Sequence, residues 1–368
     1  MGKKTKVNIP DDICHQLGIK TNNCGEYRVD KETLNKVRIL KFQKTHQGDH
    51  DALITECERL GIPVESVSHY WYKGKHFSIN VKNKKESMLD LQKVLIDELS
   101  NYSPKYPKVK RSRSKDPHLL VVDPADVHIG KLCTSFESGQ DYNNQIAVKR
   151  VKEGVQGILD KSHGFDIDRI MFVGGNDILH IDTPQRKTTS GTPQDTDGMW
   201  YNNFLLAKKL YVDILEQLMT VADVHFVFNP SNHDYTNGFF LADVVKTHFQ
   251  YCSNITFDCS IAHRKYFSYG NNLIGSTHGD GAKTNDLPLL MANESKDWTR
   301  CKHRYMYTHH VHHKTSKDFP GVTVESLRSP SGTDSWHHRN GYQHAPKAVE
   351  GFIHHPEHGQ VARLTHIF

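Results

Sequence analysis

Long apolar runs are missing from this chain of 368 residues. Apolar side chains make up 36% of it, and the mean hydropathy is −0.63. No run approaches the roughly 18 consecutive apolar residues that a membrane helix needs. The first residues, Met1-Gly2-Lys3-Lys4, lack the apolar core of a secretion signal. We therefore expect a cytosolic protein without a membrane partner.

Cysteine is present, but not in the spacing of a disulfide framework or a thiolate metal site. The seven cysteines are odd in number and scattered, and no two of them form a C-x-x-C pair. The chain therefore lacks the usual cysteine signature of a structural zinc site. It favours reduced thiols, as in a cytosolic protein.

A basic, proline-containing stretch divides the chain. Residues 101–116 contain Ser103-Pro104 and Tyr106-Pro107, followed by the run Lys108–Lys115, and offer almost nothing to bury. We interpret them as a basic linker between an N-terminal module, residues 1–100, and a larger one, residues 117–368. The net charge of +5 suits a phosphate-bearing partner. The basic run either follows a nucleic-acid backbone or is only a solvated tether.

The N-terminal module is expected to be small and mostly helical. Helices are predicted over Lys31–Gln43 and Asp51–Leu60, and a turn at Gly61-Ile62-Pro63 leads to a short helix from Val64. This is the outline of a helix-turn-helix. The aromatic, lysine-rich segment Tyr70–Val81 resembles a hairpin that could serve as a wing. Nucleic-acid binding and simple packing of a helical module both stay open.

The larger module alternates predicted strands with predicted helices. The strands are Leu119–Val122, Ile170–Val173, Val224–Phe228, Ile255–Phe257, Lys265–Tyr269, Leu273–Ser276, Tyr305–Tyr307, Val322–Leu327, Gly351–Ile353 and Gln360–Phe368. The helices are Asn144–Lys161, Met199–Leu218, Phe239–His248 and Leu287–Asn293. Such βα units followed by strand pairs predict an α/β (α+β layered) fold, with a sheet core covered by helices.

Five short patches of histidine, aspartate and asparagine follow predicted strands. They are Asp126-Val127-His128, Asn176-Asp177, Asn232-His233-Asp234, His278-Gly279-Asp280 and His310-Val311-His312. Because the patches come at strand ends, we expect them along one rim of a sheet. Carboxylates, an amide oxygen and imidazoles are the ligands that two divalent cations need when they share a site. The joint order and spacing, more than any single patch, predicts a metal centre.

In this order the patches resemble the motifs of the calcineurin-like metallophosphoesterase superfamily, over about Pro117–His313. The resemblance implies a two-sheet sandwich flanked by helices. It also implies ligands for two metals: Asp126, His128 and His312 for the first, and Asn232, His278 and His310 for the second. Asp177 would bridge both metals. His233 would lie beside the scissile phosphate, and Asp234 would orient the His233 ring or favour its charged form.

Three glycines of the family motifs are replaced in this chain. Asn176 precedes the bridging aspartate, Ser231 precedes Asn232, and His309 precedes His310. Because such glycines serve tight turns, the replacements need residues that tolerate a left-handed backbone, or else a shifted loop. The run 309–313 also permits another register. His310 and His312 are preferred because they leave the one-residue gap of the family motif.

The resemblance implies hydrolysis of a phosphodiester, with a hydroxide shared by two cations as the nucleophile. Mixed nitrogen and oxygen ligands without a thiolate suit Mn²⁺, iron, Zn²⁺ or Co²⁺ better than Mg²⁺ or Ca²⁺. Among these, manganese is the metal that the resemblance to nucleases with this pattern implies. The residues after Asp177 lack the Arg-Gly of protein phosphatases. With Asp234 where protein phosphatases carry Glu, the sequence resembles more closely the DNA-repair nucleases and the phosphoesterases of phage genomes, and segments 191–198 and 278–283 resemble the latter. We therefore predict a DNA nuclease of the phage or bacterial cytosol.

Two other functions stay open: a phosphodiesterase or phosphatase for a small nucleotide, and a binding protein built on a decayed scaffold. Four residues are candidates for substrate contact: His180, Arg186, Lys187 and Lys283. The polar loop Thr183–Asp197 either covers the metals or is a disordered surface loop. Trp336–Arg339 is a further segment that could line the rim. DNA is the expected partner, and a homo-oligomer or an ATPase partner is also open.

Overall fold

The computed structural model describes residues 5–21, 25–38, 54–55, 57–59, 69–73, 78–82, 93, 103–112 and 114–368. The chain divides into two compact units, Met1–Asp90 and Leu91–Phe368. The second unit contains all five histidine- and aspartate-bearing patches.

The described residues of the first unit form two pairs of strands. Strands β1 (Thr5–Asn8) and β2 (Glu26–Val29) pair antiparallel, and α1 (Asp11–Gln16) lies between them in the sequence. Their small core holds Ile9, Ile13, Cys14, Tyr27, Val29 and Val37. The β1–β2 pair was not predicted, because strands of four residues are too short to show a clear alternation of polar and apolar side chains.

Two other predictions for this unit are met where the chain is described. Residues 31–38 are helical, as the first predicted helix requires, and so are residues 54–55 and 57–59. Strands β3 (His69–Lys73) and β4 (Ser78–Lys82) pair antiparallel, which confirms the hairpin. The turn and the short helix predicted after residue 60 lie outside the described residues.

The second unit is built around two sheets. The first has six strands in the order β15-β14-β5-β6-β7-β8, of which β5 to β8 are parallel and β14 and β15 are antiparallel additions. Their bounds are β5 Pro117–Asp123, β6 Asp166–Gly175, β7 Asp223–Asn229, β8 Ile255–Asp258, β14 Ala348–His355 and β15 Gly359–Ile367. The parallel strands are joined by helical crossovers, which place helices against the sheet.

The second sheet has five strands in the order β12-β13-β11-β10-β9. The three central strands are parallel to one another, and the two outer strands run antiparallel to their neighbours. The bounds are β9 Arg264–Tyr269, β10 Asn272–Thr277, β11 His303–Thr308, β12 Thr315–Phe319 and β13 Val322–Ser326.

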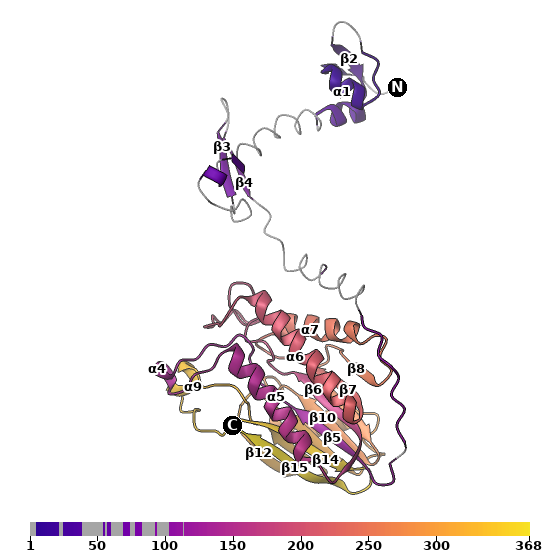
Figure 1. Ribbon diagram of the computed structural model, residues 1–368, viewed down its shortest axis with the longest axis vertical. Helices are drawn as coiled ribbons and strands as arrows, with labels where there is room; N and C mark the ends of the chain where they lie inside the picture. Colours follow the sequence, from indigo (N-terminus) through magenta and orange to yellow (C-terminus); the bar gives the residue numbers. More distant parts are fainter. Residues whose placement is uncertain are drawn as a thin grey trace. The chain divides into compact units, whose positions relative to one another are not determined.

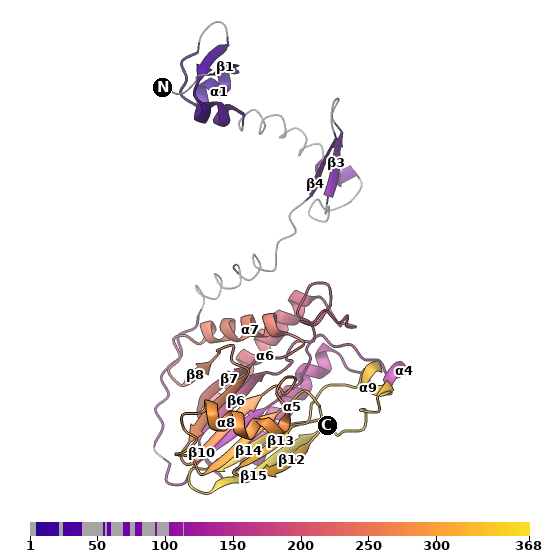
Figure 2. The same ribbon diagram turned by 180° about the vertical axis from the view of Figure 1, so that it is seen from behind.

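Helices cover the outer faces of both sheets. Helices α5 (Asn144–Lys161), α6 (Trp200–Val221) and α7 (Tyr235–His248) lie over the first sheet (Figure 1). Helix α8 (Leu287–Glu294) lies over the second sheet (Figure 2). The resulting order of layers is helix, sheet, sheet, helix, which confirms the predicted fold class.

The side chains of β5 show how the sequence produces these layers. Leu119 and Val121 face the second sheet, in a core shared with Ile274 and Tyr307. Leu120 and Val122 point the other way and join the core under the helices. Successive side chains of a strand alternate between faces. An uninterrupted apolar run is therefore what a strand covered on both sides requires.

In the described part of the second unit, four short elements escaped prediction. They are the edge strand β12 and the helical turns α4 (Ser135–Ser138), η2 (Thr284–Asp286) and α9 (Ser335–Arg339). Strand β12 reads Thr-Ser-Lys-Asp-Phe and is almost entirely exposed. A polar, lysine-bearing edge strand discourages pairing with another chain, but it carries no hydrophobic signal.

The predicted linker is held against the second unit. The Tyr106 ring stacks on Phe249 with centroids 5.1 Å apart, and its hydroxyl donates to Glu216 Oε1 at 2.6 Å. Val109 and Asn254 exchange two hydrogen bonds of 2.9 Å. Arg111 forms an ion pair with Asp223. The segment is therefore a strap anchored by particular side chains, and the expectation of a solvated tether is not met at these residues.

Two expectations about compartment can be compared with the described residues. The cysteines among them, at positions 14, 57, 133, 252, 259 and 301, are free thiols. None of the described helices combines the length and the apolar character needed to cross a bilayer.

Candidate metal centre

Strand ends from both sheets meet at one rim of the second unit. Strands β5, β6 and β7 end at Asp123, Gly175 and Asn229, and β10 and β11 end at Thr277 and Thr308. Each predicted patch begins within a few residues of one of these ends. Parallel strands bring their carboxyl ends to a common edge, so patches that are far apart in the sequence converge here.

Asp126, His128 and His312 form one group of side chains able to hold a metal ion, with ligand atoms within 4.8 Å of one another. His312 Nε2 lies 3.5 Å from Asp126 Oδ1 and 3.4 Å from His128 Nε2. These three residues are the ones predicted for the first metal.

Asp177, His278 and His310 form a second such group. His278 Nε2 lies 3.2 Å from Asp177 Oδ2 and 2.9 Å from Asn232 Oδ1, which adds the predicted amide ligand. His278 Nδ1 lies 4.0 Å from Asp126 Oδ1, so the two groups adjoin. All seven predicted ligands are therefore brought together.

The ligand loops are held in a strained backbone conformation. In these loops six non-glycine residues have φ between 51° and 70°: Asp126, His128, Asn176, Asp177, His310 and His312. Such left-handed backbone is costly for side-chain-bearing residues and persists where the surrounding structure enforces it, often at functional sites. Asn176, which replaces a glycine of the family motif, meets the expectation of a residue that tolerates this conformation.

The other two glycine replacements make specific hydrogen bonds. The Ser231 hydroxyl accepts from the Asp177 backbone N–H at 2.7 Å and donates to Asp234 Oδ1 at 2.7 Å. His309 is buried and makes two contacts, Nε2 with Asp123 Oδ2 at 3.0 Å and Nδ1 with the Thr277 carbonyl at 2.9 Å. His309 therefore points away from the ligand cluster, and the register with His310 and His312 is the one that the structure brings into the site.

Asp234 supports the loop of Asp177 and makes no contact with the His233 ring. Its Oδ2 accepts from the Leu179 backbone N–H at 2.8 Å, and its Oδ1 accepts from Ser231. Burial and the nearby charge of Asp177 raise the pKa of Asp234 to about 8. This differs from the expected role of orienting His233, because the Asp234 carboxylate is turned into the protein.

His233 is oriented by the backbone. Its Nδ1 lies 2.9 Å from the His180 carbonyl oxygen, and its backbone N–H donates to Asp177 Oδ1 at 2.9 Å. A carbonyl can only accept, so Nδ1 carries a proton and Nε2 is the atom free to exchange one. The ring centroid is 4.7 Å from that of His128.

His180 was predicted to contact the substrate, but it also supports a ligand. It is buried, and its Nδ1 lies 3.3 Å from His128 Nδ1, on the opposite side of that ring from His312. Such a contact fixes the orientation of a metal-binding imidazole. His128, His180 and His233 also lie close enough to form a third group of potential ligands.

The two carboxylates of the cluster favour positive charge beside them. Burial would raise the pKa of Asp177, but the imidazoles of His278 and His233 outweigh it and lower the pKa below its usual range. Burial would lower the pKa of His278, but the carboxylates of Asp177 and Asp126 raise it to about 9. Burial also lowers the pKa of His128 well below 6.5, which favours the neutral imidazole that binds metals.

The donor set fits divalent metal ions. The buried Nδ1 of His278 has no hydrogen-bond partner among the described residues. Unpaired buried polar atoms are uncommon and are often explained by an ion or a water. Imidazole nitrogens with carboxylate and amide oxygens, without a thiolate, suit Mn²⁺, iron, Zn²⁺ or Co²⁺.

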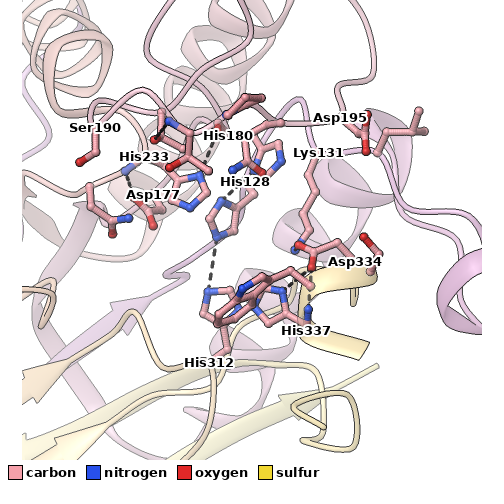
Figure 3. Close-up of a pocket in the computed structure, with 18 of the residues that line it drawn as sticks. His128, Lys131, Asp177, His180, Ser190, Asp195, His233, His312, Asp334 and His337 are labelled. Carbon is pink, nitrogen blue, oxygen red and sulfur yellow. Dashed lines mark hydrogen bonds and ion pairs between the residues drawn. The ribbon is translucent and has the colours of Figure 1, made fainter. Parts of the chain in front are cut away.

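A cavity of about 530 Å³ is lined by His128, His180, His233, His310, His312 and His337 (Figure 3). One wall comes from the loop after Asp177, through Thr188, Ser190 and residues 192–195, and another from residues 334–337. The loop Thr183–Asp197 thus borders the site, which agrees with the expectation that it lies over the metals and not with that of a disordered surface loop. Its basic residues do not: Arg186 and Lys187 are exposed and outside the cavity lining, as is Lys283. The prediction that this loop borders the site is therefore met, but the predicted basic residues do not line the cavity.

The positive charge in the cavity comes instead from Lys131, which the sequence analysis missed. Its side chain is 1% exposed, and Nζ forms an ion pair of 2.8 Å with Asp334. Nothing in the sequence distinguishes this lysine from the other cationic residues, because its burial depends on residues some 200 positions later in the chain.

Asp182 fastens the loop of the cavity wall to helix α7. Its carboxylate accepts from the backbone N–H groups of Thr236 and Asn237, at 3.1 and 2.8 Å, and from the Thr189 hydroxyl at 3.0 Å. The first N–H groups of a helix have no partner within the helix. The side chain of Asp234, at the N-cap position of α7, makes no capping hydrogen bond. The acceptor for these N–H groups is instead Asp182, which lies outside the helix.

Replacing Asp182 by alanine should lower the free energy of unfolding by about 1–2 kcal/mol, the usual cost of losing a helix cap. Urea denaturation followed by circular dichroism measures it. The matched control is Asp160→Ala, an exposed residue of α5, which should cost less than about 0.5 kcal/mol. Equal effects of the two changes would contradict the capping role.

No protein-family model and no curated protein matches this chain. Among solved structures, it is similar to a single mutant of Vps29 from Entamoeba histolytica, at 14% identity and a TM-score of 0.30, over 68% of this chain and 99% of that one. A predicted phosphoesterase from Streptococcus pneumoniae matches at 11% identity and a TM-score of 0.28, over 70% and 99% of the two chains.

A hypothetical protein from Pyrococcus horikoshii matches at 10% identity and a TM-score of 0.32, over 68% of this chain and 87% of that one. TM-scores of this size do not assign the chain to a family.

Proposed function

We propose that this protein is a phosphodiesterase that depends on two divalent metal ions, and that its substrate is DNA. The observation that carries the proposal is the meeting of two adjoining ligand groups, one containing Asp126 and the other Asp177, at the carboxyl ends of strands from both sheets. The motif order, which resembles the calcineurin-like metallophosphoesterases, gives independent support.

Two bound divalent cations would supply activation of water and neutralisation of charge on the phosphate. The first would be held by Asp126, His128 and His312, and the second by Asn232, His278 and His310, with Asp177 between them. Manganese is proposed for both positions.

The protein would contribute proton transfer and positioning. His233 borders the cavity beside Asp177, and its Nδ1 is fixed by the His180 carbonyl. Its Nε2 is then the atom that would donate a proton to the leaving oxygen or stabilise charge on the phosphate oxygens. The buried Lys131 adds positive charge to the same cavity.

DNA is proposed as the substrate because the motifs resemble those of repair nucleases and phage phosphoesterases, and because the first unit includes the aromatic and basic β3–β4 pair. A small nucleotide is the second candidate. A cavity of about 530 Å³ has the size of a small-molecule site. The N-terminal unit would then serve packing or assembly.

The test uses the full chain, freed of metal by a chelator and supplied with Mn²⁺. Its substrates are end-labelled single- and double-stranded DNA and the small diester bis-p-nitrophenyl phosphate. Cleavage of DNA that falls steeply with salt supports the nuclease, because phosphate contacts release counterions. Turnover of the small diester alone would move the substrate to nucleotides. No turnover of any of the three would refute the phosphodiesterase.

Metal binding should also stabilise the folded chain. With Mn²⁺ at about 100 times its dissociation constant, each site adds about 2.7 kcal/mol to the free energy of unfolding. We expect the unfolding temperature to rise on adding Mn²⁺ and to fall back with excess chelator, as followed by calorimetry. Mg²⁺ at equal concentration is the control and should raise it less, since histidine-rich sites bind Mg²⁺ weakly. An unfolding temperature that does not respond to Mn²⁺ would argue against the site.

A further inference from the structure

An exposed aromatic pair stands at the rim of the cavity. Trp336, in the five-residue helix α9, is 61% exposed, and Tyr342 is 55% exposed. Their ring centroids are 5.8 Å apart with planes inclined at 43°. Two large aromatic side chains left in water next to a reactive site indicate a surface that binds something.

The pair is held by partly buried polar contacts. Asp334 accepts from the His337 backbone N–H at 2.9 Å and from His337 Nδ1 at 2.7 Å, while the buried Lys131 holds the same carboxylate. The Tyr342 backbone N–H donates to the His337 carbonyl at 2.9 Å. The rings therefore project from a segment whose position is fixed from beneath.

The same contacts fix the distance from the aromatic pair to the candidate metal centre. The His337 ring stacks on the ligand His312 with centroids 5.1 Å apart and planes at 18° (Figure 3). The Trp336 ring lies 5.1 Å from that of His337. Two ring-to-ring steps thus separate an exposed indole from a predicted metal ligand, and Trp336 lines the same cavity as Asp177.

We propose that Trp336 and Tyr342 form a stacking site for an unpaired nucleobase next to the phosphate that is cleaved. The proposal rests on the proposed function. Every base offers a flat π-face, and aromatic side chains bind it without regard to sequence. The exposed His338 and Arg339 on the same short helix suit the neighbouring phosphates better than an apolar protein partner. A base paired in a duplex has no free face, so the substrate is a single strand or a frayed end.

The experiment compares two substrates with the same backbone, a ten-nucleotide thymidine strand and a strand of equal length in which every base is replaced by the abasic tetrahydrofuran analogue. The specificity constant kcat/KM is measured for the full chain with Mn²⁺. We expect the wild-type protein to prefer the strand with bases by about 5- to 100-fold, the range of one stacked base. Trp336→Ala should lose most of that preference by slowing cleavage of the thymidine strand alone.

Trp336→Phe is the matched control, because it keeps a ring that can stack and should retain most of the preference. Trp336→Ala should unfold at nearly the wild-type temperature, as expected for an exposed side chain. Cleavage of both strands at equal rates by the wild type, or an unchanged preference in Trp336→Ala, would overturn the stacking site and leave the nuclease intact. The aromatic pair would then serve another partner, such as a protein. If neither strand is cleaved, the proposed function fails first, and the stacking site with it.

Discussion

Replacing Asp177 by asparagine should lower kcat/KM for phosphodiester hydrolysis by at least about 1,000-fold. A bridging carboxylate holds two metals, and the charge that they neutralise in the transition state is worth several kcal/mol, at 1.36 kcal/mol for each tenfold change in rate. Asparagine keeps the size of the side chain and its hydrogen bond from the His233 N–H. It removes the negative charge that attracts cations. The measurement is turnover of bis-p-nitrophenyl phosphate with Mn²⁺.

The matched control for this variant is Asp160→Asn on the exposed face of α5, which should leave turnover within twofold of the wild type. Elemental analysis of the purified proteins gives a second readout, since Asp177→Asn should bind less Mn²⁺ per chain and Asp160→Asn should not. An Asp177→Asn protein with wild-type turnover and metal content would show that this carboxylate is not a ligand.

Replacing Asp123 by alanine should lower the free energy of unfolding by about 3–5 kcal/mol, because it leaves a buried imidazole without its partner. Asp123 Oδ2 lies 3.0 Å from His309 Nε2, and both side chains are fully buried. Burial alone would lower the pKa of His309, but the charge of Asp123 outweighs it and raises the pKa. The pair joins the ends of β5 and β11, with His309 directly before His310 and Asp123 three residues before Asp126. Urea denaturation at neutral pH measures the loss.

Asp297→Ala serves as the control for this prediction. Asp297 forms an ion pair of 3.0 Å with Arg300, and the two side chains are 41% and 52% exposed. An exposed pair contributes at most about 1 kcal/mol. If Asp123→Ala is no more destabilising than Asp297→Ala, the buried pair does not hold the two strand ends together.

The sheets and helices of the second unit were largely predictable from the sequence. The run Leu119–Val122 has apolar side chains on both faces, and β5 is covered on both sides. Helix α5 begins and ends at the predicted residues, Asn144 and Lys161. These elements are long or strongly apolar, and local pattern is enough to reveal them. The short strands β1 and β2 and the polar edge strand β12 lack such a pattern.

The groups of residues that could hold a metal were predictable because their chemistry is carried by residue type and spacing. A D-x-H pair after one strand and an H-x-H pair after another offer metal ligands whatever the fold of the rest of the chain. Their contacts could not be predicted. The sequence places Asp234 beside His233, but the structure turns its carboxylate towards Leu179 and Ser231. The side chains of adjacent residues often point in opposite directions, and tertiary packing decides the direction of each one.

Thus the sequence by itself determined the layered α/β fold and the residues able to bind metal, since periodicity and side-chain chemistry are local properties. Only the tertiary structure decided which charged groups reach the cavity. Arg186 and Lys187 lie in the predicted loop but outside the cavity lining, and the buried Lys131 takes their place beside Asp334. The burial of a lysine and the identity of its partner depend on residues distant in sequence, which fold together only after the sheets have formed.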